Sequence, residues 1–156
     1  YSQEASPLGT AGALRLALPL LKSESALVVN GDSFCDADLR GFWEWHRGRE
    51  ADASMLLVEV PDTRRYGRVS VDNEGRVIRF EEKNEEGAPG WINAGIYLIR
   101  RRLLEKLPEK QNVSLERDVF PAFLRKGLFG FQSKARFLDI GTPQSYQSAS
   151  RFFHEG

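Results

Sequence analysis

Two aspartates follow short apolar runs, and together they could bind a metal ion. Residues 27–29, Leu-Val-Val, lead through an Asn-Gly turn to Asp32, and the Phe-Leu pair at 137–138 leads directly to Asp139. In open α/β sheets, ligands bind beyond the carboxyl ends of the strands, so aspartates placed there can converge on one cation. Mg²⁺ is commonly held by one or two carboxylates together with substrate phosphates. A turn or a helix cap is the alternative role for each aspartate taken singly.

Other residues suited to binding a substrate lie at turns and strand ends. They are Gly9, Thr10, Gly67, Glu82, Lys83 and Asn93. Glycine lets a backbone approach a ligand closely, and a glycine inside a strand pattern, such as Gly95, often marks such an approach. A lysine can meet a phosphate as a point charge. Simple turns and solvated side chains are the alternatives for these residues.

Two further patterns indicate chemistry less directly. The triplet at 36–38, Asp-Ala-Asp, has the D-x-D form with which many glycosyltransferases bind a metal–nucleotide complex. Its place directly before an amphipathic segment predicts a helix N-terminus instead. The two histidines, His46 and His154, provide no Ser-His-Asp set and no zinc-ligand spacing. His46 lies within a predicted helix near Trp43, which indicates a partly exposed packing residue.

The composition is that of an ordinary globular protein, and it narrows the range of partners. The 156 residues are enough for one domain with a hydrophobic core. The 22 basic and 22 acidic residues cancel, so we expect neither a nucleic acid nor a membrane surface as a partner. The single cysteine, Cys35, allows no intrachain disulfide and fits a reducing cytoplasm.

The elements that must position these residues alternate between helices and strands. Helical spacing predicts helices over Ala13–Leu21 (kinked or shortened at Pro19), Leu39–Arg49, Arg101–Leu107, Leu115–Lys126 and Pro143–Phe153. Apolar or β-rich runs predict strands over Ala26–Val29, Ala53–Val60, Tyr66–Val71, Arg76–Phe80, Ile92–Ile99, Leu128–Phe131 and Ala135–Leu138. The run before Asp32 is typical of a buried parallel strand. The order, with a β-rich insertion in the middle, predicts an α/β domain with a mixed sheet.

Cap and turn residues mark the limits of these elements. The expected helix caps are Asp36 or Asp38, Ser114 and Thr142 at N-termini and Gly127 at a C-terminus. The sequence Asp-Asn-Glu-Gly at 72–75 predicts a hairpin turn, and the polar, Gly-containing segment 84–89 predicts a loop.

Six short segments, taken in order, resemble the sugar-1-phosphate nucleotidyltransferase family. They are Pro7-Leu8-Gly9-Thr10-Ala11-Gly12, Asn30-Gly31-Asp32, Tyr66-Gly67, Phe80-Glu81-Glu82-Lys83, Asn93-Ala94-Gly95-Ile96-Tyr97 and Asp139-Ile140-Gly141-Thr142-Pro143. No single segment is specific for this family. The occurrence of all six in family order and at family-like spacing is specific. Residues 65–69 (Arg-Tyr-Gly-Arg-Val) and 92–97 (Ile-Asn-Ala-Gly-Ile-Tyr) are most similar to the mannose- and D-glycero-D-manno-heptose-1-phosphate guanylyltransferases.

The resemblance implies a fold, a reaction and a cofactor. The fold would be the Rossmann-like, three-layer nucleotide-diphospho-sugar transferase fold with a mixed sheet, and residues 1–156 would form one partial catalytic domain. A sugar 1-phosphate oxygen would attack the α-phosphate of a nucleoside triphosphate, with GTP favoured, giving a nucleotide sugar and pyrophosphate. Mg²⁺ would be the cofactor and the cytoplasm the compartment. Such a reaction depends on positioning and charge neutralisation.

The resemblance also assigns roles at the reacting phosphates. Asp32 and Asp139 would hold Mg²⁺ against the α-phosphate. Lys83 would bind the phosphate of the sugar substrate. The D-x-D triplet at 36–38 would have no catalytic part.

The remaining candidates would bind the two substrates. Gly9 would contact the nucleotide near its base, and Thr10 would belong to the same substrate-binding turn. Glu82 would bind sugar hydroxyls. Gly67 and Asn93 would line the sugar pocket through backbone and side-chain contacts.

One feature of the family is missing from these residues. A Gly-rich loop of the form G-G-x-G-T-R, which grips the triphosphate in the family, does not occur in the sequence. The chain starts at Tyr1 and not at Met, so we expect a piece of a longer enzyme or a relative that has lost this half of the site. The isolated chain should then have little transferase activity. Loss of the N-terminal βα unit would also leave an unpaired strand edge, so we expect self-association as a homo-oligomer or marginal stability of the isolated chain.

Two other functions stay open at this point. The chain could be a non-catalytic, regulatory or nucleotide-sugar-binding relative that keeps the sugar half of the pocket. It could also be a D-x-D glycosyltransferase of related α/β architecture, with Asp36 and Asp38 at the metal. Loss of activity on substitution of Asp32 or Asp139 would favour nucleotidyl transfer, and loss on substitution of Asp36 or Asp38 would favour the glycosyltransferase.

Overall fold

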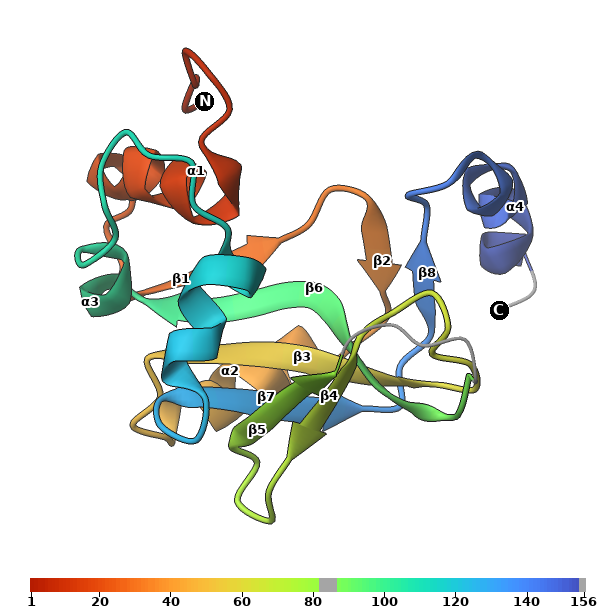
Figure 1. Cartoon of the computed structure of the whole chain (residues 1–156). Coiled ribbons are helices and arrows are strands. Elements are labelled where there is room, and N and C mark those ends of the chain that lie inside the picture. Colours follow the sequence, from red (N-terminus) through yellow and green to blue (C-terminus); the bar gives the residue numbers. More distant parts are fainter. Residues whose placement is uncertain (82–86, 155–156) are drawn as a thin grey trace.

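The strands form one mixed sheet and a separate two-stranded ribbon (Figure 1). The computed structural model describes residues 1–81 and 87–154. The sheet contains β1 (Ser25–Val29), β3 (Ala53–Val60), β4 (Arg68–Val71), β5 (Val77–Glu81), β6 (Gly90–Arg100) and β7 (Leu128–Ser133), and the ribbon contains β2 (Ser33–Cys35) and β8 (Phe137–Asp139). The order is β5-β4-β6-β3-β7, with β1 also on β6. Since β7 runs parallel to β3 and the other neighbours are antiparallel, the predicted mixed sheet is confirmed.

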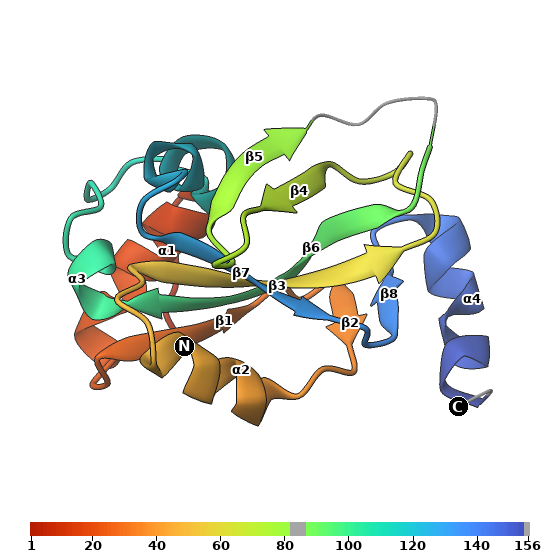
Figure 2. The same cartoon turned by 90° about the horizontal axis from the view of Figure 1, so that it is seen from below.

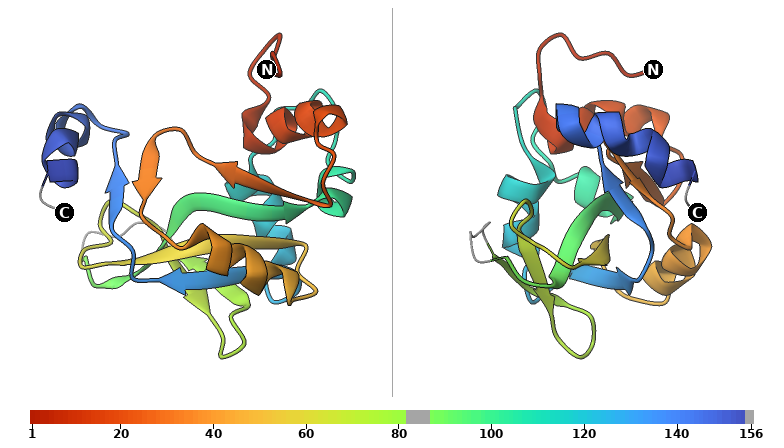
Figure 3. Two further views of the ribbon diagram at one scale, coloured as in Figure 1. Left: turned by 180° about the vertical axis from the view of Figure 1, so that it is seen from behind. Right: turned by 90° about the vertical axis from the view of Figure 1, so that its right-hand side faces the viewer.

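Helices cover both faces of the sheet, which gives three layers (Figures 2 and 3). The helices are α1 (Gly9–Ala17), α2 (Leu39–Arg47), α3 (Arg101–Leu104) and α4 (Pro143–His154), with the 3-10 helices η1 (Leu18–Leu20) and η3 (Phe120–Phe123) and the π-helix η2 (Leu115–Val119). One face carries α2, and the opposite face carries α1, α3, η2 and η3. No helix in the described part of the chain is long and apolar enough to span a bilayer.

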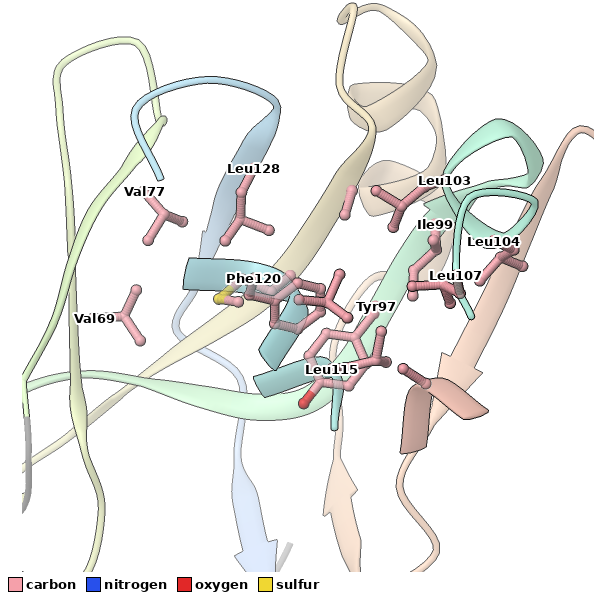
Figure 4. Close-up of a cluster of buried hydrophobic side chains, with 14 of the residues drawn as sticks. Val69, Val77, Tyr97, Ile99, Leu103, Leu104, Leu107, Leu115, Phe120 and Leu128 are labelled. Atoms are coloured by element: carbon pink, nitrogen blue, oxygen red, sulfur yellow. The ribbon is translucent and has the colours of Figure 1, made fainter. Parts of the chain in front are cut away.

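Alternate side chains of the two central strands supply two hydrophobic cores. The first core includes Met55, Leu57, Tyr97 and Ile99 and packs under η2 and η3, and the second includes Leu56, Val58, Ile96 and Leu98 and packs against α2. Successive side chains of a strand point to opposite faces, so strands covered on both sides need continuous apolar runs. Figure 4 shows the first core, with Tyr97 beside Phe120 and Leu115.

The sheet divides along one edge of β6. β1 pairs with residues 96–100 of this edge, whereas β4 meets it only at Ile92. Between these two contacts β6 has a bulge relative to β3. Met55 pairs with Tyr97 and Leu57 pairs with Asn93, so two residues along β3 correspond to four residues along β6. Bulges re-aim side chains and are common beside active sites. The fork therefore places residues 93–95 where their polar groups can face a ligand.

Several boundaries agree with the sequence. The predicted strand Ala53–Val60 is β3 without change. Asp38 is the residue that caps α2, since its Oδ1 accepts a hydrogen bond from the backbone N–H of Gly41 at 2.9 Å. Thr142 Oγ1 likewise accepts from the N–H of Ser145 at 3.2 Å, at the start of α4.

The hairpin and the loop after it were also predicted. The turn at 72–75 joins β4 and β5, with Gly75 at a φ of +82°. Of the predicted loop, residues 87–89 have no regular structure, and residues 84–86 lie outside the described part of the chain.

The first helix starts earlier than helical spacing predicts. The pattern indicates a start at Ala13, but α1 begins at Gly9. Its first turn is held from outside, because the N–H groups of Ala11 and Gly12 donate to the carbonyl of Val113 at 2.9 and 3.3 Å. The predicted shortening of the helix at Pro19 is confirmed, since α1 ends at Ala17 and the chain continues as the 3-10 turn η1.

The prediction of one helix over Leu115–Lys126 is wrong. Ser114 caps its start as predicted, accepting from the N–H of Arg117 at 3.2 Å, but the segment is π-helical in η2 and 3-10 in η3. Pro121 supplies the reason, because proline has no N–H for the helical ladder and its ring clashes with the carbonyl four residues earlier. Gly127 caps no helix; its carbonyl accepts from the N–H of Asp52 at 2.9 Å.

The prediction of a buried parallel strand before Asp32 is also wrong in part. β1 is a strand, but it runs antiparallel to β6, its only partner among the described strands. Leu27 and Val29 are 45% and 52% exposed, whereas Ala26 and Val28 pack on the first core. A single apolar run does not reveal how many neighbours a strand has.

His46 on α2 makes the stability of the fold dependent on pH. Its ring is fully buried and not partly exposed as predicted, and Nδ1 lies 2.8 Å from Ser54 Oγ. Burial and the Arg100 cation lower the pKa of His46 from 6.5 to about 4. Near pH 6 the unfolded chain binds a proton at His46 and the folded chain does not. The stability that the neutral, buried ring contributes is therefore complete above about pH 6.5 and is lost as the pH falls to about 4.

We expect this loss to reach at most about 3 kcal/mol of unfolding free energy. Urea unfolding at pH 7 and pH 4.5 measures it. His46→Gln, which keeps a polar group beside Ser54 but cannot titrate, should show a smaller decrease between the two pH values. An equal decrease in both proteins would contradict the assignment.

Candidate functional site at the fork of the sheet

A pocket of about 290 Å³ opens at the fork between β1, β6 and the β2–β8 ribbon. Its lining is polar apart from a few side chains and comes from segments far apart in the sequence. The lining residues are Asn30, Asp32, Ser33, Tyr66, Asn93, Ala94, Gly95, Tyr97, Glu116, Phe137 and Asp139. Three of the predicted site residues, Asp32, Asn93 and Asp139, are thus brought together.

The β2–β8 ribbon places the two aspartates side by side. Ser33, which follows Asp32, is paired with Asp139 in the antiparallel register. The backbone carbonyl of Asp32 also accepts from the N–H of Ile140 at 2.9 Å. Two strand ends separated by more than a hundred residues therefore present carboxylates to one pocket.

The two carboxylates have different surroundings. Asp139 Oδ2 lies 3.2 Å from Arg65 Nη2, and its Oδ1 accepts from the N–H of Gly141 at 2.7 Å. Burial and the nearby Asp139 charge raise the pKa of Tyr66, so its hydroxyl stays protonated. Asp32 is exposed, and within the described residues its carboxylate has no hydrogen bond or ion pair.

This donor set suits a hard cation that takes its other ligands from a substrate. Two carboxylates on one pocket wall match the way in which Mg²⁺ is held with substrate phosphates. No group of three or more His, Cys, Asp or Glu side chains in the described residues could enclose a metal by itself. The chemistry of the two aspartates therefore fits Mg²⁺ but not a closed protein site.

A chain of hydrogen bonds forms the wall of the pocket at β6. Asn93 Nδ2 donates to the Tyr97 hydroxyl at 2.8 Å, and that hydroxyl donates to Glu116 Oε1 at 2.9 Å. Burial, with the Glu116 charge as a second cause, raises the pKa of Tyr97. Asn93 Oδ1 accepts from the N–H of Gly95 at 3.0 Å, which closes the bulge on itself. The side chain of Asn93 is therefore held at both ends.

Gly9 and Thr10 lie behind this wall and do not line the pocket. Thr10 Oγ1 donates to Glu116 Oε2 at 3.1 Å. Gly9 has a φ of +68°, and a Cβ there would lie 2.5 Å from the carbonyl oxygen of Val113. The positive φ and the close approach of the Val113 carbonyl therefore explain the glycine at position 9 without a ligand.

The other predicted residues have different outcomes. Gly67 lies next to the pocket-lining Tyr66, and a Cβ on it would be 2.8 Å from the carbonyl oxygen of Glu81. Glu82 and Lys83 lie outside the described residues. In the D-x-D triplet, Asp36 lies 3.4 Å from Arg136 in an ion pair and Asp38 caps α2, and neither lines the pocket.

Five polar residues that line the pocket were not predicted as site residues: Asn30, Ser33, Tyr66, Tyr97 and Glu116. Glu116 has the spacing of a residue in the first turn after the Ser114 cap, and that local pattern hid its long-range contact with β6. Tyr97 follows Asn93 by four residues. In a strand without a bulge, two such side chains would lie on the same face but far apart. The bulge brings the two side chains into contact, and only the pairing of β6 with β3 reveals it.

Comparison with known proteins identifies the family to which this chain is similar. The family model for nucleotidyl transferases matches residues 1–156. A mannose-1-phosphate guanylyltransferase of Mycobacterium tuberculosis is 38% identical over 153 residues, which cover 96% of this chain and 43% of the relative. A D-glycero-alpha-D-manno-heptose 1-phosphate guanylyltransferase of Aneurinibacillus thermoaerophilus is 36% identical over 152 residues, which cover 97% of this chain and 65% of the relative.

A solved structure has the same fold. HddC from Yersinia pseudotuberculosis, crystallised with GMP-PN, superposes with a TM-score of 0.84 at 35% identity, over 96% of this chain and 64% of HddC. The chain thus spans between 43% and 65% of the length of these three proteins.

Proposed function

This chain belongs to the nucleotidyl transferase family, and on that premise we propose that its protein joins a nucleoside monophosphate to a sugar 1-phosphate. The products are a nucleotide sugar and pyrophosphate. The nucleotide is GMP, donated by GTP. The two relatives named above are guanylyltransferases, and HddC was crystallised with GMP-PN, which supports guanine.

The observation that carries this proposal is the pocket at the fork of the sheet. It joins two carboxylates, Asp32 and Asp139, to a hydrogen-bonded wall that presents the amide of Asn93. Phosphoryl transfer between anionic groups needs cationic charge at the reacting phosphate and rigid positioning of both substrates. The carboxylates can bind a cation that supplies the positive charge, and the hydrogen-bonded wall can position the substrates.

We assign Mg²⁺ to Asp32 and Asp139. When bound, the metal would supply positive charge at the α-phosphate. Asp139 is oriented for this by the N–H of Gly141, and Arg65 beside it would neutralise further charge. Lys83, from the family likeness, would bind the sugar phosphate.

The sugar would lie against β6. Asn93 would offer its amide to hydroxyl groups, and Gly67 would offer backbone groups from the start of the β-hairpin. Glu82 is assigned to sugar hydroxyls by likeness to the family. The Gly9–Thr10 turn would approach the nucleotide on its base side.

We test the function in the parent protein, meaning the longest natural chain that contains these 156 residues. Pyrophosphate release is measured with GTP, ATP, UTP and dTTP, each with mannose 1-phosphate or D-glycero-D-manno-heptose 1-phosphate. We expect the highest kcat/KM with GTP and one of these two sugars. Binding of a nucleotide sugar without any turnover would instead indicate a non-catalytic relative.

The 156-residue chain tested alone should release little or no pyrophosphate, because the family's triphosphate loop is not among its residues. Robust turnover by this chain would contradict that expectation.

We also propose that the isolated chain self-associates as a homo-oligomer. The outer edge of β1 has no partner among the described strands, and Leu27 and Val29 beside it are exposed. Such an edge offers free backbone groups for pairing with a second copy.

A further inference from the structure

We propose that Glu116 is a positioning residue that fixes the sugar-binding amide of Asn93 relative to the Gly9–Thr10 turn, acting through the hydroxyl of Tyr97. The proposal rests on the proposed function for the identity of the two substrates. The chain of contacts itself is independent of it.

Both carboxylate oxygens of Glu116 are engaged, and by different parts of the fold. Oε2 accepts from Thr10 Oγ1 at 3.1 Å and from Ser114 Oγ at 2.9 Å. Oε1 accepts from the Tyr97 hydroxyl at 2.9 Å. Hydrogen bonds to a charged group are about twice as strong as neutral ones. One half-buried carboxylate thus ties the first turn of α1 to the middle of β6.

Thr10 is held firmly enough to transmit this contact. Its Oγ1 accepts from the N–H of Leu115 at 2.8 Å while it donates to Glu116. The carbonyl of Val113 accepts from the N–H groups of Ala11 and Gly12. Hydrogen bonds therefore connect the start of α1 directly to the start of η2.

Tyr97 sets the direction of the hydrogen bonds. Its single proton goes to Glu116, so the phenolic oxygen must accept from Asn93 Nδ2 at 2.8 Å. The amide of Asn93 then has one orientation, with Oδ1 toward the N–H of Gly95. A carboxylate at position 116 can only accept, and this fixes the donor and acceptor roles along the whole chain.

This order matters because Asn93 lines the pocket at the bulge of β6. An Asn free to flip would present NH₂ or C=O to a sugar hydroxyl at random. Holding one orientation before the substrate arrives lowers the entropy lost on binding. The expected consequence is a lower KM for the sugar 1-phosphate.

The test uses three variants of the parent protein. Tyr97→Phe removes the bridging oxygen and keeps the ring in the core. Glu116→Gln keeps the shape of the side chain but places an NH₂ group where one acceptor oxygen stood. Phe120→Leu is the matched control, because its ring packs 5.2 Å from that of Tyr97 in the same core but has no polar atom in the chain.

We expect Tyr97→Phe to raise the KM for the sugar 1-phosphate about tenfold, in line with loss of one hydrogen bond to a charged group, and to change the KM for GTP less than about threefold. Glu116→Gln should raise both KM values, since Glu116 contacts the Thr10 turn as well. Phe120→Leu should lower thermal stability with little change in either KM. Similar KM changes in all three variants would overturn the proposal.

A second measurement keeps the inference testable if no substrate pair turns over. Amide hydrogen exchange of the Gly95 N–H reports whether Asn93 Oδ1 stays in place. We expect this exchange to be several times faster in Tyr97→Phe and Glu116→Gln than in Phe120→Leu. Unchanged protection in the first two variants would refute the positioning role. Absence of turnover in the unsubstituted parent protein would refute the proposed function alone.

Discussion

Asp32→Asn and Asp139→Asn in the parent protein are each expected to lower nucleotide-sugar formation roughly 10²- to 10³-fold. Each substitution keeps the shape of the side chain and removes one negative charge from the pocket. The reaction would lose its cation ligand where charge develops on the α-phosphate. The concentration of Mg²⁺ needed for half-maximal rate should rise at the same time, which initial-rate assays across a Mg²⁺ titration measure.

The effect should not come from unfolding. Asp32 is exposed, and its substitution should change stability by less than about 0.5 kcal/mol. Asp139 also loses its exposed pair with Arg65, which is worth at most about 1 kcal/mol. Thermal denaturation of each variant checks both values.

Asp36→Ala is the matched control, because Asp36 is an exposed aspartate outside the pocket whose described ion pair is with Arg136. Its activity should stay within about twofold of the unsubstituted protein, as for most surface substitutions. If Asp36→Ala abolished activity while Asp32→Asn did not, the D-x-D glycosyltransferase would replace nucleotidyl transfer as the function.

Gly95→Ala is expected to destabilise the protein by about 2–4 kcal/mol and to raise the KM for the sugar 1-phosphate. Gly95 has a φ of +74°, a left-handed conformation that L-residues rarely adopt. An added Cβ would also lie 2.8 Å from Asn30 Nδ2 and 3.0 Å from Asn30 Cβ, so Asn30 must move. Asn30 is two residues before Asp32 and lines the same pocket.

Gly31→Ala is the control for this prediction, since nothing lies within 4 Å of a Cβ built on Gly31 and it needs no left-handed backbone. We expect it to change stability by less than about 0.5 kcal/mol. Urea unfolding of both variants gives the comparison. Equal stabilities of Gly95→Ala and Gly31→Ala would mean that the fork tolerates a side chain.

Much of the fold could be predicted because its signals are local. β3, the β4–β5 hairpin and the Asp38 and Thr142 caps depend on side-chain alternation, turn chemistry and short-range hydrogen bonds, all of which are written in neighbouring residues. The apolar spacing predicts one helix through Pro121, and this prediction is wrong although the proline is itself a local signal that interrupts a helix.

The site was predictable only where its residues follow a predicted strand or lie in a glycine-containing strand segment. Asp32, Asp139 and Asn93 were found because the carboxyl ends of strands and glycine-containing strand segments are common places for ligands. The contact of Glu116 with Tyr97 was not predicted, since Glu116 follows the Ser114 cap by two residues and that local position accounts for a carboxylate there. Glu82 and Lys83 stay predictions from likeness to the family.

The sequence by itself determined the α/β class, the candidate metal carboxylates and the likeness to sugar-1-phosphate nucleotidyltransferases, since apolar periodicity and short motifs require only neighbouring residues. The tertiary structure decided how β1 and β4 share one edge of β6, where the bulge lies, and that Tyr97 and Glu116 connect Asn93 to Thr10. These features depend on strand register and on contacts across about a hundred residues. Such contacts depend on the simultaneous packing of several elements, and no single stretch of sequence encodes them.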